Sequence, residues 1–261
     1  MLQRLYQGFT DFPALQDQFL AGRIALFLDV DGTLLEIARR PDAVRVTEPL
    51  RALLADLLHD NGGAVALVSG RTLADLDQLF APLTFAAAGL HGIERRSAGG
   101  IIHTHVDSAS LRAVRDFLSD NSCEGLLIED KGGAIVLHYR ERPELATRAH
   151  ELARQAAEIA GERWEAVRGK MSVEIRDGGV GKHHALERFM QEAPFAGRIP
   201  AFLGDDRTDE DGFAYVNARG GWSVHIGTGP TCARRNLPDP MAVWRLLRAL
   251  CPRHGHEHQR A

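Results

Sequence analysis

Residues 24–34 read IALFLDVDGTL, an apolar run that is followed directly by two aspartates two positions apart. The run Ile24–Leu28 predicts a fully buried strand. Asp29 and Asp31 come next, and two carboxylates this close raise a pKa unless a cation lies between them. A divalent metal ion beside a reactive carboxylate explains the pair. An ordinary strand end with an Asp-Gly turn explains it equally well, so the rest of the chain has to decide.

Further short apolar segments repeat this pattern of a strand, a loop and a helix. The segments that predict strands are residues 64–68, 84–88 and 199–203. Each ends in a loop of small or polar residues, and helical periodicity separates the strands. Such repeats predict a parallel sheet with right-handed crossovers, whose strand-end loops gather at one edge. We therefore expect an α/β fold with a Rossmann-like parallel core.

The pattern changes in the middle of the chain. Residues 107–179 predict the order α-β-β-α-β-β, with strands joined by short Gly-containing turns that indicate antiparallel pairing. We expect this block to be a smaller α/β domain inserted into the first. Residues 1–106 and 180–261 would then form one discontinuous core domain.

Composition limits the partners. Of 261 residues, 44% are hydrophobic and 25% charged, which is typical of a soluble globular protein. The net charge of −4 argues against nucleic acid or a membrane surface as the main partner, and no apolar run approaches the ~20 residues that span a bilayer. Three scattered cysteines form no disulfide or zinc pattern, and residues 1–13 do not read as a secretion signal. We expect a cytoplasmic protein.

Four separate segments carry side chains that suit phosphoryl transfer. They hold Asp29 with Asp31, Ser69, Lys182, and Asp205 with Asp209. Mg²⁺ prefers oxygen ligands, which two aspartate carboxylates and a backbone carbonyl can supply. A lysine and a serine hydroxyl beside such an ion suit a phosphoryl group. One aspartate can then attack phosphorus, while a second protonates the leaving oxygen and later activates water.

In order and spacing, these segments resemble the four motifs of the haloacid dehalogenase-like phosphatases: DVDGTL at residues 29–34, Ser69, Lys182, and GDD-x-x-D at residues 204–209. The resemblance implies that Asp29 is the nucleophile and Asp31 the general acid and base. It implies that Ser69 and Lys182 hold the phosphoryl group. It also implies Mg²⁺ as cofactor, with Asp29, Asp31 through its carbonyl, Asp205 and Asp209 as metal residues. The insert resembles the α/β cap of one branch of this superfamily.

Further motifs resemble the trehalose-6-phosphate phosphatases: SGR at 69–71, GLHGIE at 89–94, LHYR at 137–140, EIR at 174–176 and GDD-x-TDE at 204–210. This resemblance implies hydrolysis of trehalose 6-phosphate, the last step of trehalose biosynthesis, and functional pairing with a trehalose-6-phosphate synthase. Among the residues in or near these motifs, we expect six to bind the sugar phosphate: Gly70, Arg71, His91, Glu129, Lys131 and Glu174.

Alternatives remain open at this point. Asp205 to Asp211 can be a plain acidic helix start, Lys182 a surface lysine, and the three charges on the insert exposed strand residues. A neighbouring function is another capped sugar phosphatase, acting on sucrose phosphate, mannosyl-phosphoglycerate or a hexose phosphate. A different class is a non-catalytic binding module of the same fold. The four motifs in order favour catalysis, and a panel of sugar phosphates with Mg²⁺ would identify the substrate.

Overall fold

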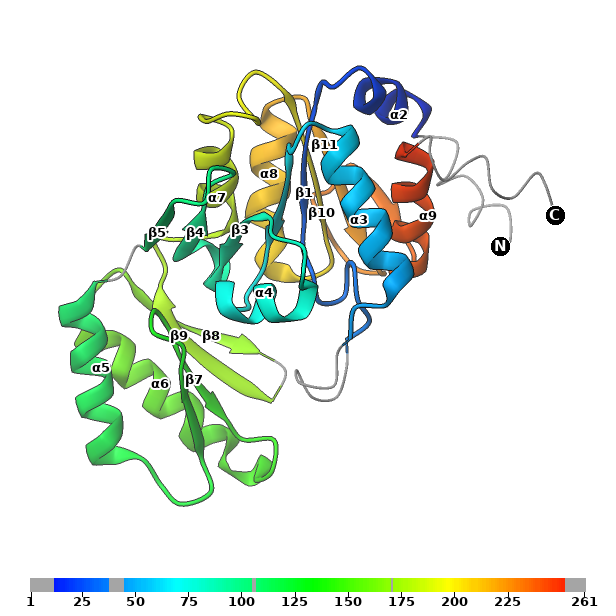
Figure 1. Cartoon of the computed structure of the whole chain (residues 1–261). Coiled ribbons are helices and arrows are strands. Elements are labelled where there is room, and N and C mark those ends of the chain that lie inside the picture. The colour runs from blue at the N-terminus through cyan, green and yellow to red at the C-terminus, as the bar shows by residue number, and fades with distance from the viewer. Residues whose placement is uncertain (1–11, 38–44, 105–106, 170, 252–261) are drawn as a thin grey trace. The chain divides into compact units, whose positions relative to one another are not determined.

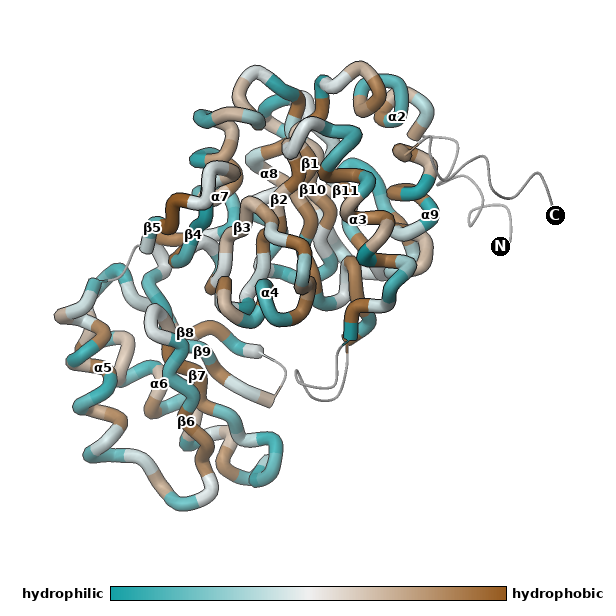
Figure 2. The backbone as a smooth tube through the Cα atoms, viewed as in Figure 1, coloured by the Kyte–Doolittle hydropathy of each residue, from teal (hydrophilic) through white to brown (hydrophobic). Residues whose placement is uncertain are grey.

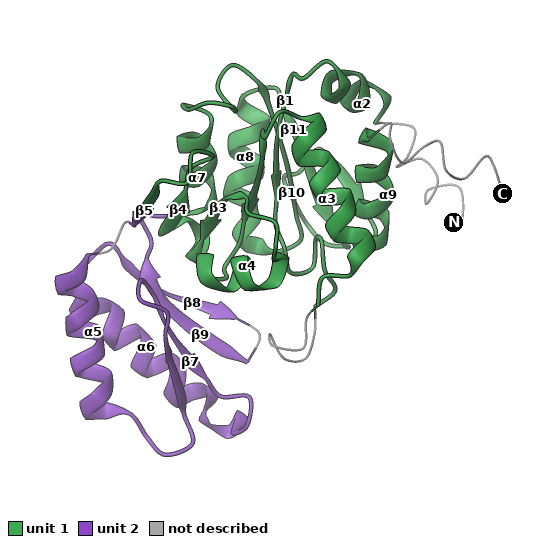
Figure 3. Cartoon of the chain, in the orientation of Figure 1, with its two compact units in different colours: residues 1–102, 181–261 green, residues 103–180 purple. Residues whose placement is uncertain are grey.

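The computed structural model describes residues 12–37, 45–104, 107–169 and 171–251. The chain divides into two compact units, which Figure 3 colours separately. Unit 1 consists of Met1–Ile102 and Gly181–Ala261, and unit 2 is His103–Val180. Unit 1 therefore consists of two segments that are separate in the sequence, and each unit is described by itself below.

Unit 1 is built on a sheet that has eight strands in the described part of the chain, and the last of these strands crosses the boundary into unit 2 after Ile102. The order is β12 (Arg235–Leu237), β11 (Trp222–Ile226), β10 (Ile199–Gly204), β1 (Ile24–Leu28), β2 (Val65–Val68), β3 (Ala86–Gly89), β4 (Glu94–Arg96) and β5 (Ile102–Thr104). Neighbouring strands from β12 to β3 are parallel, whereas β3 and β4 are antiparallel. The predicted parallel core is confirmed.

Helices cover both faces of this sheet (Figure 1). Alternate residues of β1 face opposite ways: Leu26 and Leu28 join one hydrophobic cluster, and Phe27 joins the other. The first cluster takes in α2 (Pro13–Leu20), α3 (Glu48–Asp60), α4 (Leu73–Phe80) and α9 (Pro240–Leu250). The second takes in α7 (Lys182–Phe189) and α8 (Glu210–Ala218). Burial on both faces explains why β1 is apolar throughout, as the brown colour in Figure 2 shows.

The carboxyl ends of β1, β2 and β10 meet at one edge of the sheet. The backbone N–H of Asp29 donates to the carbonyl of Leu203 (2.9 Å), and the N–H of Ser69 donates to the carbonyl of Ala88 (2.9 Å). These bonds continue the sheet register by one residue beyond the strands. Asp29 and Ser69, the first residues of the loops after β1 and β2, are thereby fixed in place at the edge where ligands bind in such folds.

Unit 2 has the order α5 (Ser108–Asn121), β6 (Leu127–Asp130), β7 (Ile135–His138), α6 (Ala146–Ala160), β8 (Trp164–Gly169) and β9 (Ser172–Asp177). Its strands form an antiparallel sheet in the order β6-β7-β9-β8. Both helices pack with Ile135, Leu137 and Val173 on one face of that sheet. The predicted succession of elements and the expected fold class, a parallel core with a smaller antiparallel insert, are confirmed.

Some boundaries differ from the prediction. Strand β12 lies where the sequence predicts only a Gly- and Pro-containing loop. Of its three residues only Leu237 is buried, so the strand has no apolar periodicity from which it could be predicted. The sequence predicts the last two strands of the insert at residues 164–167 and 171–175. Both β8 and β9 end two residues later than this, and β9 also begins one residue later. Within the described residues, no helix is both long enough and apolar enough to cross a membrane.

Candidate active site

A buried lysine ties two of the strand-end loops together. Lys182 begins α7, and its Nζ donates to Asp29 Oδ1 (2.7 Å) and to Asp209 Oδ1 (2.6 Å). All three side chains are almost fully buried. The alternative that Lys182 is a surface lysine is therefore wrong.

Asp209 also organises the loop after β10. Its Oδ2 accepts hydrogen bonds from the backbone N–H groups of Asp205 (3.1 Å) and Asp206 (3.0 Å). One carboxylate thus binds the lysine through one oxygen and the loop backbone through the other. The short helical turn Arg207–Asp209 begins at this point and leads into α8. The aspartates of this segment are more than a helix start, because Asp209 is fully buried among these contacts.

Three carboxylates converge in a way that suits a hard divalent cation. Asp29, Asp205 and Asp209 each offer an oxygen, and these atoms lie within 4.8 Å of one another. Asp205 Oδ1 is buried and accepts no hydrogen bond from any residue in the described ranges. A buried carboxylate oxygen without a donor is costly, and a metal ion would satisfy it. The chemistry of these donors fits Mg²⁺.

The electrostatics point the same way. Burial raises the pKa of Asp29 well above its usual value, although Lys182 opposes the shift. Burial and the neighbouring Asp209 raise the pKa of Asp205 to about 7. Burial lowers the pKa of Lys182, but the Asp209 and Asp29 carboxylates outweigh it, so that pKa lies above its normal range. One ammonium is too little charge for three carboxylates, and a divalent cation would supply the remainder.

Gly32 makes room for this arrangement. Its φ of +88° is left-handed, and a Cβ at this position would overlap the Asp205 carboxylate. The sequence marks Gly32 as a turn residue, but the close approach of a side chain 173 positions away leaves no sequence signal. Gly32 is therefore a site residue that sequence reasoning missed.

Asp31 does not join the carboxylate cluster through its side chain. Its two oxygens accept hydrogen bonds from Arg71 Nε and Nη2, both at 2.6 Å. Ser69 is buried at the end of β2, and its Oγ accepts a hydrogen bond from the Arg71 N–H (3.2 Å). Gly70 lies against the His91 ring. The metal contact of the Asp31 carbonyl, the phosphoryl contact of Ser69, and the substrate contacts of Gly70, Arg71 and His91 stay predictions.

The three expected sugar-binding residues of unit 2 lie close together at β6, β7 and β9. Val136 of β7 pairs with Glu129 of β6 on one side and with Glu174 of β9 on the other. Neighbouring residues in each strand pack under the helices, so Glu129 and Glu174 lie on the opposite face. Lys131 follows at the β6–β7 turn, where its N–H donates to the carbonyl of Ala134 (2.9 Å). Their contact with a sugar stays a prediction.

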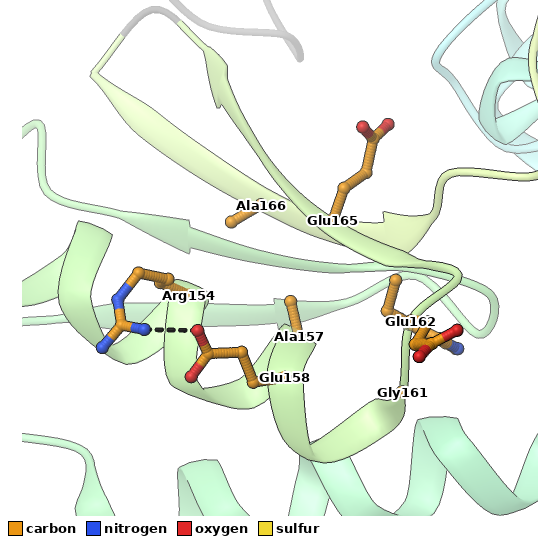
Figure 4. Close-up of a pocket in the computed structure, with 8 residues that line it drawn as sticks. Arg154, Ala157, Glu158, Gly161, Glu162, Glu165 and Ala166 are labelled. Atoms are coloured by element: carbon orange, nitrogen blue, oxygen red, sulfur yellow. Dashed lines mark hydrogen bonds and ion pairs between the residues drawn. The ribbon is translucent and has the colours of Figure 1, made fainter.

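Unit 2 also has a hollow of about 450 Å³ beside α6 and β8, shown in Figure 4. Its lining comprises Arg154, Ala157, Glu158, Gly161, Glu162, Trp164, Glu165 and Ala166. None of the expected site residues lines it. Three glutamates make it unsuited to a phosphate ester, because like charges repel.

The parallel core, the antiparallel insert and the carboxylate cluster beside Lys182 define a haloacid dehalogenase-like phosphatase fold. A profile of the family described as "Trehalose-phosphatase" matches residues 27–239. The chain belongs to this family, whose members are phosphoric monoester hydrolases.

Individual proteins are also similar. A "Probable trehalose-phosphate phosphatase" of Sinorhizobium fredii is 46% identical over 230 residues, which cover 87% of each chain. The "Trehalose-6-phosphate phosphatase" of Escherichia coli is 42% identical over 241 residues, covering 90% of this chain and 89% of that one. The fold matches the C-terminal domain of Candida albicans trehalose-6-phosphate phosphatase with a TM-score of 0.78 at 23% identity, covering 92% and 97% of the two chains.

Proposed function

We propose that this protein hydrolyses trehalose 6-phosphate to trehalose and phosphate. The observation that carries the proposal is the buried contact of Lys182 with Asp29 and Asp209, within a chain of the trehalose-phosphatase family. A lysine that bridges a nucleophile and a metal-binding loop at the edge of a parallel sheet is arranged for phosphoryl transfer. A non-catalytic module has no need for this buried charge cluster.

The reaction proceeds in two balanced steps. In the first, an Asp29 oxygen bonds to phosphorus as the bond from phosphorus to the sugar oxygen breaks, and the Asp31 carboxyl gives that oxygen its proton. In the second, water attacks the phosphorus of the aspartyl phosphate, Asp31 takes up a proton from that water, and Asp29 is released as a carboxylate with inorganic phosphate. Lys182 and Ser69 hold the phosphoryl oxygens during both steps.

Mg²⁺ would be held by the Asp29 and Asp205 carboxylates and the Asp31 carbonyl, with Asp209 as an auxiliary residue. When bound, it neutralises charge on the phosphoryl oxygens. In this proposal Lys182, which donates a hydrogen bond to Asp29, keeps the nucleophilic carboxylate of Asp29 close to the phosphorus. Asp29 is only 4% exposed, so its carboxylate approaches the phosphate from a site with little bulk water.

Specificity for the sugar belongs in this proposal to unit 2. We assign it the role of the cap, with Glu129, Lys131 and Glu174 as hydrogen-bonding partners of the sugar hydroxyls. A site built to bond hydroxyl groups rejects analogues that leave its polar groups unpaired. The proposal also places the protein in the cytoplasm, where it would remove the phosphate from the product of a trehalose-6-phosphate synthase.

Stoichiometry tests this function. The purified protein with Mg²⁺ and trehalose 6-phosphate should release trehalose and phosphate in equal amounts, and a chelator should stop both. The Asp29→Asn variant serves as the control for contaminating phosphatases. Failure of the wild-type chain to release trehalose would reject the proposal.

A further inference from the structure

Asp31 is held by a fork of two short hydrogen bonds. Arg71 Nε donates to Oδ2 and Nη2 to Oδ1, each at 2.6 Å, which is the strong bidentate geometry of arginine with a carboxylate. The two residues follow neighbouring strands, β1 and β2, and lie 40 positions apart. This pairing fixes both the position and the plane of the Asp31 carboxylate.

The exposures of the two side chains show which one faces outward. The Asp31 side chain is 38% exposed, whereas the Arg71 side chain is 15% exposed. The Asp31 side chain is therefore the more accessible of the two, as a group that exchanges protons with a substrate needs to be.

Arg71 is itself fixed by the backbone around it. Its N–H donates to Ser69 Oγ (3.2 Å), and its carbonyl accepts from the N–H of Leu90 (2.9 Å). The neighbouring N–H of His91 donates to the carbonyl of Ser69 (3.0 Å). The turn after β3 therefore holds both ends of the Ser69–Arg71 loop.

That turn has an unusual backbone. Leu90 and His91 have φ values of +49° and +57°, a left-handed conformation that is unfavourable for a residue with a side chain. Such strain persists only where the surroundings enforce it, and it clusters at functional sites. Here the left-handed backbone directs the N–H groups of Leu90 and His91 toward the loop that carries Arg71. A Cβ at Gly70 would lie 2.8 Å from the His91 ring, so a glycine lets the two loops pack together.

We propose that Arg71 is a positioning residue that orients Asp31 for proton transfer to and from the substrate, with the Leu90–Gly92 turn as its support. This inference rests on the proposed function, because it concerns the acid and base of that reaction. In this proposal Arg71 acts through Asp31, and this role replaces the direct contact with the sugar phosphate that the sequence resemblance implies for Arg71. Proton transfer needs close alignment of the carboxylate with the leaving oxygen, and the fork supplies that alignment.

The test is a double-mutant cycle of Arg71 and Asp31 in the full chain with Mg²⁺. Arg71→Lys keeps the charge but loses the fork, and Arg71→Gln removes the charge. A matched control is Arg96→Lys, because Arg96 forks onto Asp77 at 2.7 and 2.6 Å elsewhere in unit 1. Melting temperatures of all variants show which of them fold. The readouts are kcat, KM and inhibition by inorganic phosphate, with trehalose 6-phosphate and with p-nitrophenyl phosphate as substrates.

We expect Arg71→Lys to lower kcat for trehalose 6-phosphate by roughly tenfold to a hundredfold, with KM and phosphate inhibition within about twofold of wild type. In the Asp31→Asn background the same change should cause no further loss. Arg96→Lys should leave kcat unchanged.

Two results would overturn the inference. A raised KM with weaker phosphate inhibition would make Arg71 a direct ligand of the phosphate. A loss that is just as large in the Asp31→Asn background would show that Arg71 acts independently of Asp31. If the wild-type chain does not hydrolyse trehalose 6-phosphate, the proposed function fails. The cycle on p-nitrophenyl phosphate then still tests whether Arg71 acts through Asp31 in the second step, because p-nitrophenolate leaves without needing a proton but the aspartyl phosphate must still be hydrolysed.

Discussion

The two aspartates of the loop after β1 look equivalent in the sequence but have different surroundings. Asp29 is buried against Lys182, and Asp31 is partly exposed on Arg71. The sequence predicts that both aspartates belong to the active site, because the four phosphatase motifs occur along the chain in the order typical of the family. It does not predict the partner of Asp31, since that contact depends on how two loops meet.

Asp29→Asn should abolish turnover, because an amide cannot attack phosphorus as a carboxylate does. The near-equal size of the two side chains should preserve the packing around Lys182. Phosphate release and thermal unfolding of the same preparation check both parts. Measurable turnover in a clean preparation would mean that Asp29 is not the nucleophile.

Gly32→Ala should reduce Mg²⁺ affinity and activity at least tenfold, because the added methyl group would displace the Asp205 carboxylate and the φ of +88° disfavours alanine. Gly22→Ala is the matched control, since Gly22 has a φ of +66° but open space around it. Mg²⁺ titration followed by thermal shift compares the two. Equal Mg²⁺ affinities for both variants would contradict the proposed crowding.

At the scale of elements, apolar runs and turn residues predict nearly every strand of both sheets, because buried strands have a distinct composition. Strand β12 is not predicted from the sequence, because it has only three residues and lies at the edge of the sheet. The sequence also does not predict that Glu129, Val136 and Glu174 lie side by side on three neighbouring strands, because strand register depends on pairing across the sheet.

Lys131→Ala should lower kcat/KM for trehalose 6-phosphate at least tenfold more than for p-nitrophenyl phosphate, which lacks sugar hydroxyls. Arg154→Ala is the control, because Arg154 is a half-exposed cation of unit 2 that pairs with Glu151 on α6. Equal losses on both substrates for Lys131→Ala would show that Lys131 does not recognise the sugar.

At the scale of the whole molecule, the sequence predicts a metal site but not its effect on stability. In the metal-free protein, the pKa of Asp205 is about 7, above its ordinary 3.8. The folded protein therefore keeps a proton that the unfolded chain loses, and stability falls as pH rises between these values. Mg²⁺ needs the ionised carboxylate, so its binding becomes stronger over the same interval.

At a fixed Mg²⁺ concentration, the increase in melting temperature caused by Mg²⁺ should therefore grow between pH 5 and pH 8. The added stability is about 2.7 kcal/mol at the pH where that concentration equals a hundred times Kd. Thermal unfolding with and without Mg²⁺ at each pH measures it. Asp205→Asn should reduce the increase strongly at every pH. An increase that is independent of pH, or unaffected in the Asp205→Asn variant, would contradict this account of the site.

The central claim is that the protein is a phosphatase for trehalose 6-phosphate. Its most direct test is kcat/KM with Mg²⁺ across trehalose 6-phosphate, sucrose 6-phosphate, mannosyl-phosphoglycerate, glucose 6-phosphate and p-nitrophenyl phosphate. The account predicts the highest value for trehalose 6-phosphate, at least tenfold above any other member of the panel. An equal or higher value for a monosaccharide phosphate or another disaccharide phosphate would contradict it.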